Sequence, residues 1–436
     1  MVRARGLGRP GQVSDPRDRG PGNRTDWFGQ PRGLTILFLT EMWEKFSFFG
    51  MRALLVYYMV KALGFGGPQA SLVYGLYAGF VYLTPILGGA ISDRWLGRRR
   101  AVIIGGSLMV IGHFMMAFPA LFFPALAAIA LGNGFYLPNL ASQIDRLYAP
   151  ADARRGGAYN VYYVGVNIGG FLAPLVCGTL GELYGWHWGF GVAGVGMAAG
   201  LAIYILGGRW LPAEPARRPA QIAAAEPLAA GTLRLMIGVL LAVVIFRCAY
   251  EQLGNSVALW ADADVDRRVG SFIIPGSWFQ SLNPLLVFLV TPLLVRRWAR
   301  AAEQGREPPA LRKMALGGGG LMLAFLGLAA IVVLGGVGVH WLWLAAFITA
   351  YTIAELHILP VGLGLFARLA PPGHEATTIA AWFLASFAGN LLAGALGALW
   401  TQVDHAAFFV MMAGCGAVAG AVLLGLARSG WRAAAD

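Results

Sequence analysis

Charged side chains occur inside an otherwise apolar stretch of the chain. The segment TEMWEKFSFFGMRALLVYYM (residues 40–59) contains Glu41, Glu44, Lys45 and Arg52. At 3.6 residues per helical turn, Glu41, Lys45 and Arg52 share one stripe with Phe48, and Glu44 lies at its border. An ionised side chain at bilayer depth costs at least ~2.5–3.5 kcal/mol, so such groups persist where they face one another or a wet cavity. One wet face of this helix is therefore expected.

Two carboxylates three residues apart repel each other when both are ionised, and Lys45 counteracts this repulsion. The competition predicts a carboxyl group that gains or loses a proton as the accessible side of the membrane changes. The same charges could instead only fix neighbouring helices to each other, because a buried ion pair alone is no proof of transport. The other ionisable residues expected at bilayer depth are Arg247, Glu251 and Glu355.

The composition indicates which class of protein must position these charges. Of 436 residues, 58% are hydrophobic and only 12% are charged. Hydropathy predicts twelve apolar stretches, each about long enough to cross a ~30 Å hydrocarbon core. We therefore expect an all-α membrane protein with 12 transmembrane helices in two six-helix bundles.

The widest break between apolar stretches is 209–231, which is rich in Ala, Pro and Arg and divides the stretches six and six. Two similar bundles are what alternating access requires, because one half rocks against the other around a central site. The expected parts are a disordered basic N-terminal tail (1–32), an N-terminal bundle (33–208), a cytoplasmic linker (209–231), a C-terminal bundle (232–428) and a C-terminal tail (429–436).

The basic residues predict the orientation of the spans. With the N-terminus inside, the cytoplasmic connections beyond the tail carry 20 Lys and Arg residues, whereas the outer connections carry only Lys61, Arg267 and Arg268. This asymmetry follows the positive-inside rule, so the net charge of +12 requires no nucleic-acid partner. We expect a multi-pass protein of the cell inner membrane with both termini in the cytoplasm.

The connection between the second and third stretches, GGAISDRWLGRRR (88–100), places Asp93, Arg94 and Arg98 at facing helix ends. An acid and bases in such positions can pair and hold a cytoplasmic gate closed. The segment resembles the gate motif of the major facilitator superfamily, which implies the major facilitator fold. Alternatively, it is only a positively charged turn that fixes the topology.

Several longer segments resemble the proton-dependent oligopeptide transporter (POT) family of that superfamily. The first span resembles the family's ExxER-F-S-Y-Y-G-M-R-A-L-L pattern. Further similar segments are GNGFYLPNLASQIDRLY (132–148), YNVYYVGVNIGGFLAPLVCGTLGELYGWHWGF (159–190), SWFQSLNPLLVFLVTPLL (277–294), AELHILPVGLG (354–364) and AAWFLASFAGNLLAG (380–394). The resemblance implies a proton-coupled symporter that imports di- and tripeptides by alternating access.

The resemblance also implies roles for individual residues. Glu41, Glu44 and Lys45 match the proton-coupling motif of the first span, with Lys45 in place of the usual arginine. Glu251 matches an acidic position of the seventh span that takes part in proton coupling, and Glu355 matches the residue that receives the amino terminus of the peptide. The other substrate-binding residues expected are Arg52, Tyr77, Tyr82, Asn167, Asn283 and Trp382.

Three further residues, besides Lys45, depart from the family pattern. Leu137 stands where the family has a lysine, and Phe48 and Phe49 stand where it has tyrosines. The lysine is the usual partner of the seventh-span glutamate, so we hypothesise that Arg247, four residues before Glu251, replaces it for proton coupling. Arg247 could instead only pack or extend towards the membrane surface. The two phenylalanines remove hydroxyl donors, each worth ~0.5–1.5 kcal/mol if bonded to ligand, so substrate preference could have shifted.

Two other functions fit the same fold, namely transport of a non-peptide solute and proton-driven export of lipophilic compounds. An intramembrane enzyme is not expected, because the spans lack GxSG, HExxH or paired aspartates, and a channel would need rings of one charge. The three cysteines, Cys177, Cys248 and Cys415, have no metal-ligand spacing, so no metal and no cofactor are expected. The expected partners of this monomer are short peptides, protons and the lipid bilayer.

Overall fold

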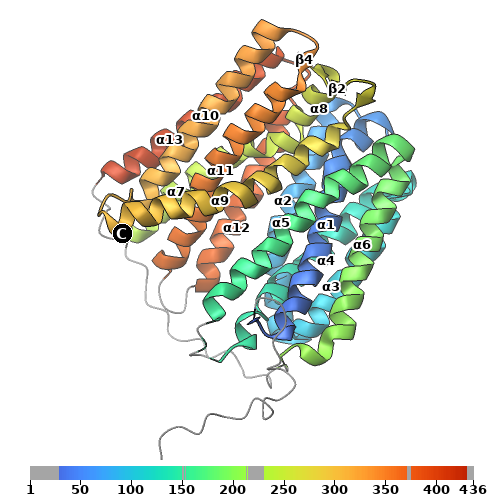
Figure 1. Cartoon of the computed structure of the whole chain (residues 1–436), viewed down its shortest axis with the longest axis vertical. Helices are drawn as coiled ribbons and strands as arrows, with labels where there is room; N and C mark the ends of the chain where they lie inside the picture. Colours follow the sequence, from blue (N-terminus) through green and yellow to red (C-terminus); the bar gives the residue numbers. More distant parts are fainter. Residues whose placement is uncertain are drawn as a thin grey trace, which may run out of the picture.

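The structure of the protein is a computed structural model that describes residues 29–149, 152, 154–212, 214, 230–370 and 375–429. The predicted N-terminal tail lies outside these residues except for 29–32, and most of the predicted linker and C-terminal tail also lie outside them. The described part of the chain is almost entirely helical (Figure 1).

The helices follow one another along the chain with short connections. They are α1 (Arg32–Lys61), α2 (Gly67–Ile91), α3 (Arg98–Met115), α4 (Phe122–Ala141), α5 (Arg155–Thr179), α6 (Trp186–Leu206), α7 (Ala230–Tyr250), α8 (Ser256–Ala263), α9 (Phe279–Glu303), α10 (Ala310–Gly335), α11 (Trp341–Leu369), α12 (Glu375–Gly397) and α13 (His405–Arg428). Strand β1 (Val265–Asp266) pairs in parallel with β4 (Val339–His340), and β2 (Arg268–Val269) pairs antiparallel with β3 (Phe272–Ile273).

Among the described residues, 10 helical segments are long and apolar enough to cross a membrane. Helices α1 and α3 are not in that set, and both carry charges: α1 holds the acids and bases noted above, and α3 begins with three arginines. With these two helices the described residues contain twelve spans, of which the seventh consists of α7, the 3-10 turn η9 (Glu251–Gly254) and α8. The predicted fold class is therefore confirmed.

Helices α1–α6 form one bundle and α7–α13 form the other (Figure 1). In the first bundle α1 packs on α5 and α6; in the second, α10 packs on α11 and α13. The bundles meet where α2 packs on α12 and α5 packs on α9. Below, the near end is the end of the molecule at which α1 begins, and the far end is the end at which α1 finishes.

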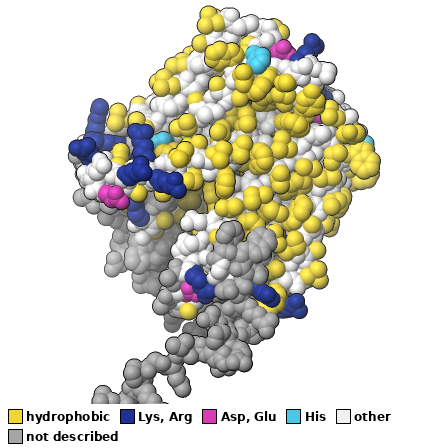
Figure 2. All heavy atoms as spheres, viewed as in Figure 1, with side chains coloured by type: hydrophobic (Ala, Val, Ile, Leu, Met, Phe, Trp, Pro, Cys, Tyr) yellow, Lys and Arg dark blue, Asp and Glu magenta, His cyan; other side chains and the backbone are white. Residues whose placement is uncertain are grey.

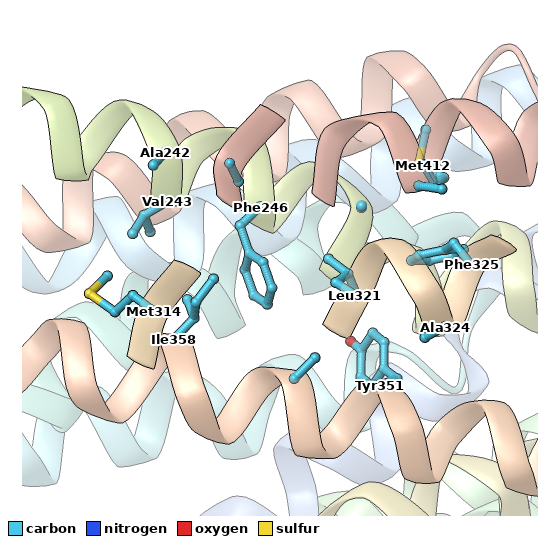
Figure 3. Packing of buried hydrophobic residues seen from close by; sticks show 14 of the residues in the cluster. Ala242, Val243, Phe246, Met314, Leu321, Ala324, Phe325, Tyr351, Ile358 and Met412 are labelled. Atoms are coloured by element: carbon cyan, nitrogen blue, oxygen red, sulfur yellow. The ribbon is translucent and has the colours of Figure 1, made fainter. Parts of the chain in front are cut away.

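Glycine allows the helices to approach closely at these contacts. A Cβ atom on Gly75 of α2 would lie 2.5 Å from the Cα atom of Gly394 in α12, and one on Gly318 of α10 would lie 2.6 Å from Gly420 in α13. Lipid tails are as apolar as leucine, so close packing rather than the hydrophobic effect holds such helices together. Figure 3 shows the packed interior of the second bundle, which includes Phe246, Leu321, Phe325, Tyr351 and Met412.

The surface agrees with a membrane-spanning protein. In Figure 2 a broad apolar surface covers the middle of the molecule, and the visible charged side chains gather towards the ends of the helices. Leu, Ile, Val and Phe side chains are exposed along most spans. The chain is a multi-pass membrane protein.

Contacts at the far end join the two bundles. The carboxylate of Glu182, in the turn η7 (Leu180–Tyr184) after α5, accepts hydrogen bonds from the backbone N–H groups of Gly276 and Ser277 at 2.9 and 2.8 Å. Lys61 lies 2.7 Å from Asp262 across the same boundary. The bundles diverge towards the near end (Figure 1). The structure therefore shows the molecule closed at the far end.

The predicted gate residues lie at the near end of the first bundle. The side chain of Asp93 is 71% exposed, and the Nε atom of Arg98 is 4.0 Å from its carboxylate. Arg94 is also exposed. Asp93 and Arg98 thus contact each other only loosely in this conformation.

Candidate substrate cavity

A cavity of about 260 Å³ lies between the two bundles near the middle of the spans. Its charged lining residues come from three helices: Glu44, Lys45 and Arg52 from α1, Arg247 from α7, and Glu355 from α11. The uncharged polar lining residues are Tyr82, Asn133, Tyr163, Asn167, Tyr250 and Asn283. Phe48, Phe49 and Leu137, the three further departures noted above, also line it. The predicted wet face of α1 thus faces a shared cavity.

On α1, two buried carboxylates share one ammonium group. Lys45 Nζ lies 3.3 Å from Glu41 Oε1 and 2.5 Å from Glu44 Oε2. The other oxygens, Glu41 Oε2 and Glu44 Oε1, are buried and have no hydrogen-bond partner among the described residues. Burying a charge is costly unless it is paired, and Lys45 can neutralise only one of the two acids. This cluster therefore carries one excess negative charge when both acids are ionised, and one proton or other cation would neutralise it.

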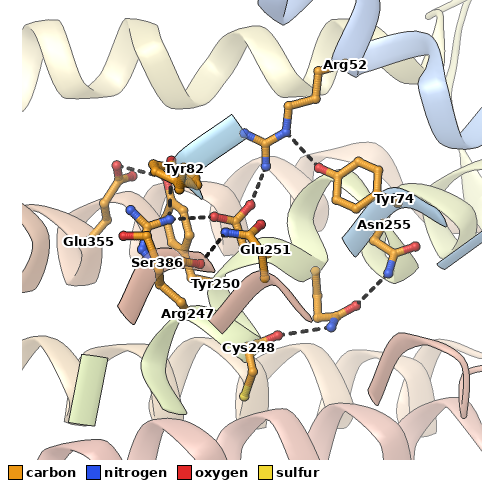
Figure 4. A network of polar contacts seen from close by, with 12 residues as sticks. Arg52, Tyr74, Tyr82, Arg247, Cys248, Tyr250, Glu251, Asn255, Glu355 and Ser386 are labelled. Atoms are coloured by element: carbon orange, nitrogen blue, oxygen red, sulfur yellow. Dashed lines mark hydrogen bonds and ion pairs between the residues drawn. The ribbon is translucent and has the colours of Figure 1, made fainter. Parts of the chain in front are cut away.

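On α7 and η9, Glu251 is held between two arginines (Figure 4). Arg247 Nη1 donates to Glu251 Oε1 at 2.7 Å, and Arg52 Nη2 of α1 donates to Glu251 Oε2. Arg52 Nε also donates to the hydroxyl of Tyr74 at 2.8 Å. Since Arg52 belongs to the first bundle and Glu251 to the second, this carboxylate joins the bundles at the centre of the molecule.

The carboxylate of Glu355 has a different environment. Asn283 Nδ2 of α9 donates to one of its oxygens at 2.6 Å, and the Tyr250 hydroxyl of α7 donates to the other at 3.0 Å. Both donors are uncharged, and no ion pair of the described residues involves Glu355. Its negative charge is therefore oriented by its neighbours but remains available to a cationic group in the cavity.

Arg247 contacts Tyr82 as well as Glu251. Its guanidinium carbon is 4.7 Å from the ring centroid of Tyr82, and Nη1 is 3.4 Å from the Tyr82 hydroxyl. Leu137 of α4 lines the same cavity. The structure thus brings the extra arginine, Glu251 and the uncharged replacement of the family's lysine into one region.

Not every predicted residue reaches the cavity. Tyr77 and Trp382 are buried in helix contacts and do not line it. Glu41 is buried and does not line it either. Tyr250, Tyr163 and Asn133 also line it and were not predicted, although Asn133 and Tyr163 lie within the segments 132–148 and 159–190 that resemble the family. Tyr250 directly precedes Glu251, but one residue turns a helix by about 100°, so adjacency says little about which residue its hydroxyl meets.

Twelve spans in two bundles around a polar central cavity that is closed at one end define a secondary transporter with the major facilitator fold. The family model of the POT family matches residues 99–224 and 224–411. The chain belongs to the POT family, as its motifs predict.

Two peptide transporters and a solved structure are similar over most of the chain. A peptide transporter of Yersinia enterocolitica is 34% identical over 86% of this chain and 89% of its own length. A di-/tripeptide transporter of Lactococcus lactis subsp. cremoris is 30% identical over 92% of this chain and 96% of its own. The crystal structure of a mutant POT peptide transporter in complex with alafosfalin has a TM-score of 0.85 at 30% identity, covering 94% of this chain and 97% of that one.

Proposed function

We propose that this protein is a proton-coupled symporter that imports di- and tripeptides across the cell inner membrane by alternating access. The names of the two relatives support this substrate class. The single observation that carries the proposal is the central cavity, whose lining holds the carboxylate of Glu355, which is in no ion pair of the described residues, together with three cations. The positive-inside rule assigns the near end and both termini to the cytoplasm.

A short zwitterionic peptide matches this distribution of charge. Its ammonium group would bind Glu355 through charge-assisted hydrogen bonds, and its carboxylate would bind a basic residue of the other bundle, Lys45 or Arg52. Tyr82, Asn167 and Asn283 line the space between and would bind the peptide bond. The separation of the two charges would select the length of the peptide.

Protons would enter through the carboxylates of the same region. Glu41, Glu44, Glu251 and Glu355 face only three cations, so the described site has one excess negative charge that a proton can neutralise. Protonation of Glu251 would weaken its bond to Arg52 and with it a link between the bundles. The two bodies that then move would be 33–208 and 232–428 of a monomer, connected by 209–231, with Asp93, Arg94 and Arg98 closing the cytoplasmic side in the other state.

A non-peptide solute is the second candidate. The observation that favours it is the presence of Leu137, Phe48 and Phe49 in the cavity wall, where each replaces a polar group of the family pattern. Proton-driven export of lipophilic compounds is a third use of the same fold. The direction of substrate movement distinguishes export from import.

Uptake of labelled di-alanine into proteoliposomes, with and without an inward proton gradient, tests the proposal. We expect saturable uptake that the gradient accelerates and other dipeptides inhibit. A membrane potential of 100 mV supplies ~2.3 kcal/mol per charge, enough for about 40-fold accumulation. Absence of uptake by folded protein, or gradient-driven export, would overturn it.

A further inference from the structure

A second cavity, of about 610 Å³, lies at the near end of the second bundle, between α9, α10 and α11. Its lining residues include Trp298, Lys313, Pro360, Gly364 and Arg368. At 100° per residue, Pro360, Gly364 and Arg368 lie roughly 140°, 180° and 220° around α11 from Glu355. This cavity is therefore on the face of α11 opposite the central cavity, and the substrate path does not include it.

The cavity lies in a strongly basic part of the molecule. Lys313 is only 8% exposed; its ammonium group pairs with Glu307 and lies 4.4 Å from the ring centroid of Trp298. Arg368 lines the same cavity and is exposed. The neighbouring exposed arginines are Arg296, Arg297, Arg300, Arg306 and Arg312. Lys and Arg side chains gather at the end of α9 in Figure 2. Glu307 also lines the cavity, and Glu303 lies at the end of α9, but these two acids are outnumbered by the basic residues, so the site favours an anion.

Apart from Glu307, Lys313 and Arg368, the lining residues are uncharged and mostly apolar. Pro308, Pro309, Pro360 and Val361 line the cavity beside the charged groups. Trp298 packs edge-on against His357, with ring centroids 5.5 Å apart, and tryptophan is typical of the boundary between membrane and water. A ligand with both a negative charge and a hydrocarbon part would therefore contact the basic residues and the apolar residues of the cavity, whereas a free ion would contact only the basic ones.

We propose that this cavity binds the headgroup of an anionic phospholipid of the near-end leaflet. The phosphate would lie between Lys313 and Arg368, and the glycerol with the first acyl carbons would pack on the prolines. Basic pockets between spans at the cytoplasmic surface are suited to such headgroups. The proposal is independent of which substrate the central cavity transports.

Native mass spectrometry of the full-length protein in mixed micelles of phosphatidylcholine and phosphatidylglycerol tests the proposal. Wild type is expected to retain phosphatidylglycerol selectively, and Arg368→Ala to lower that retention about tenfold, as for one lost charge-assisted hydrogen bond. Arg368→Lys should retain most of it. Arg428→Ala is the matched control, because Arg428 is a basic residue of the last turn of α13 at the same end and outside the cavity.

Three results would overturn the proposal. The first is equal retention of phosphatidylglycerol by wild type and Arg368→Ala. The second is that wild type retains phosphatidylcholine as well as phosphatidylglycerol. The third is displacement of the lipid by 10 mM inorganic phosphate, which would indicate a site for small anions. Unchanged thermal unfolding of Arg368→Ala shows that any loss of lipid is local.

Discussion

Three carboxylates in and beside the central cavity have three different environments. Glu355 accepts hydrogen bonds from uncharged donors, Glu251 is held between two arginines, and Glu44 shares one lysine with Glu41. These differences suit different tasks. A carboxylate that is in no ion pair can bind an ammonium group of a ligand, whereas protonation of a carboxylate that bridges two arginines would release both arginines. Each task can be tested at a single position.

Arg247→Leu should abolish proton-driven uptake while the protein remains folded. The substitution removes the 2.7 Å bond to Glu251 and leaves a buried carboxylate with one arginine fewer. Arg247→Lys keeps the charge and should retain part of the activity. Restoration of uptake in the double variant Arg247→Leu/Leu137→Lys would show that the position of the cation is exchangeable. Wild-type uptake by Arg247→Leu alone would dismiss this role of Arg247.

Glu355→Gln should weaken recognition of the peptide amino terminus. One charge-assisted hydrogen bond is worth about 1.5–3 kcal/mol, so we expect the KM for di-alanine to rise roughly 10- to 150-fold. N-acetylated di-alanine, which lacks the ammonium group, should be a poor competitor for wild type. If Glu355→Gln has a normal KM and wild type accepts the acetylated peptide, Glu355 does not bind the amino terminus.

Among the helices, α1 shows what a sequence can and cannot predict. The period of 3.6 residues is a property of one helix, and of the predicted stripe Lys45, Phe48 and Arg52 do line the cavity. Glu41 of that stripe does not line it, whereas Glu44, expected at the border, does. The partner of Arg52 could not be predicted from this spacing, because Glu251 lies 199 residues away on another element. Which residues meet across helices depends on the rotation of each helix about its axis, and hydropathy does not specify that rotation among buried spans.

The contact of Glu182 with the 3-10 turn η10 (Gly276–Trp278), which leads into α9, offers a test of the far-end closure. A carboxylate at a helix N-terminus is stabilised by the free backbone N–H groups there, and here the carboxylate and the helix belong to different bundles. Glu182→Ala should weaken the closure by about 1.5–3 kcal/mol. We expect a cysteine introduced at Asn167 to react faster with an impermeant thiol reagent added at the far end.

Asp404→Ala is the matched control for this experiment. Asp404 caps α13 by accepting the N–H of Ala407 at 3.1 Å, so its loss removes a helix cap at the same end without removing a contact between bundles. Equal labelling rates for wild type, Glu182→Ala and Asp404→Ala would mean that Glu182 does not hold the bundles together.

For the molecule as a whole, hydropathy predicted the twelve spans and their division into two bundles, because burial in lipid requires long apolar helices. It did not predict that the seventh span breaks at Glu251–Gly254. A Cβ atom on Gly254 would lie 2.2 Å from the Tyr74 hydroxyl, so this turn fits closely against α2 of the other bundle. Gly254 and Asn255 are typical of turns, but their contact with the other bundle cannot be predicted from the local sequence.

In the proposed mechanism, the buried carboxylates Glu41, Glu44 and Glu251 exchange protons during transport. The most direct test is to measure the movement of protons. Proteoliposomes with a trapped pH indicator and no imposed gradient would receive di-alanine, and the internal pH would be followed together with the uptake of label. We predict acidification that starts with the peptide, saturates with it and is lost in Glu251→Gln. Peptide uptake without any change in internal pH would contradict the account.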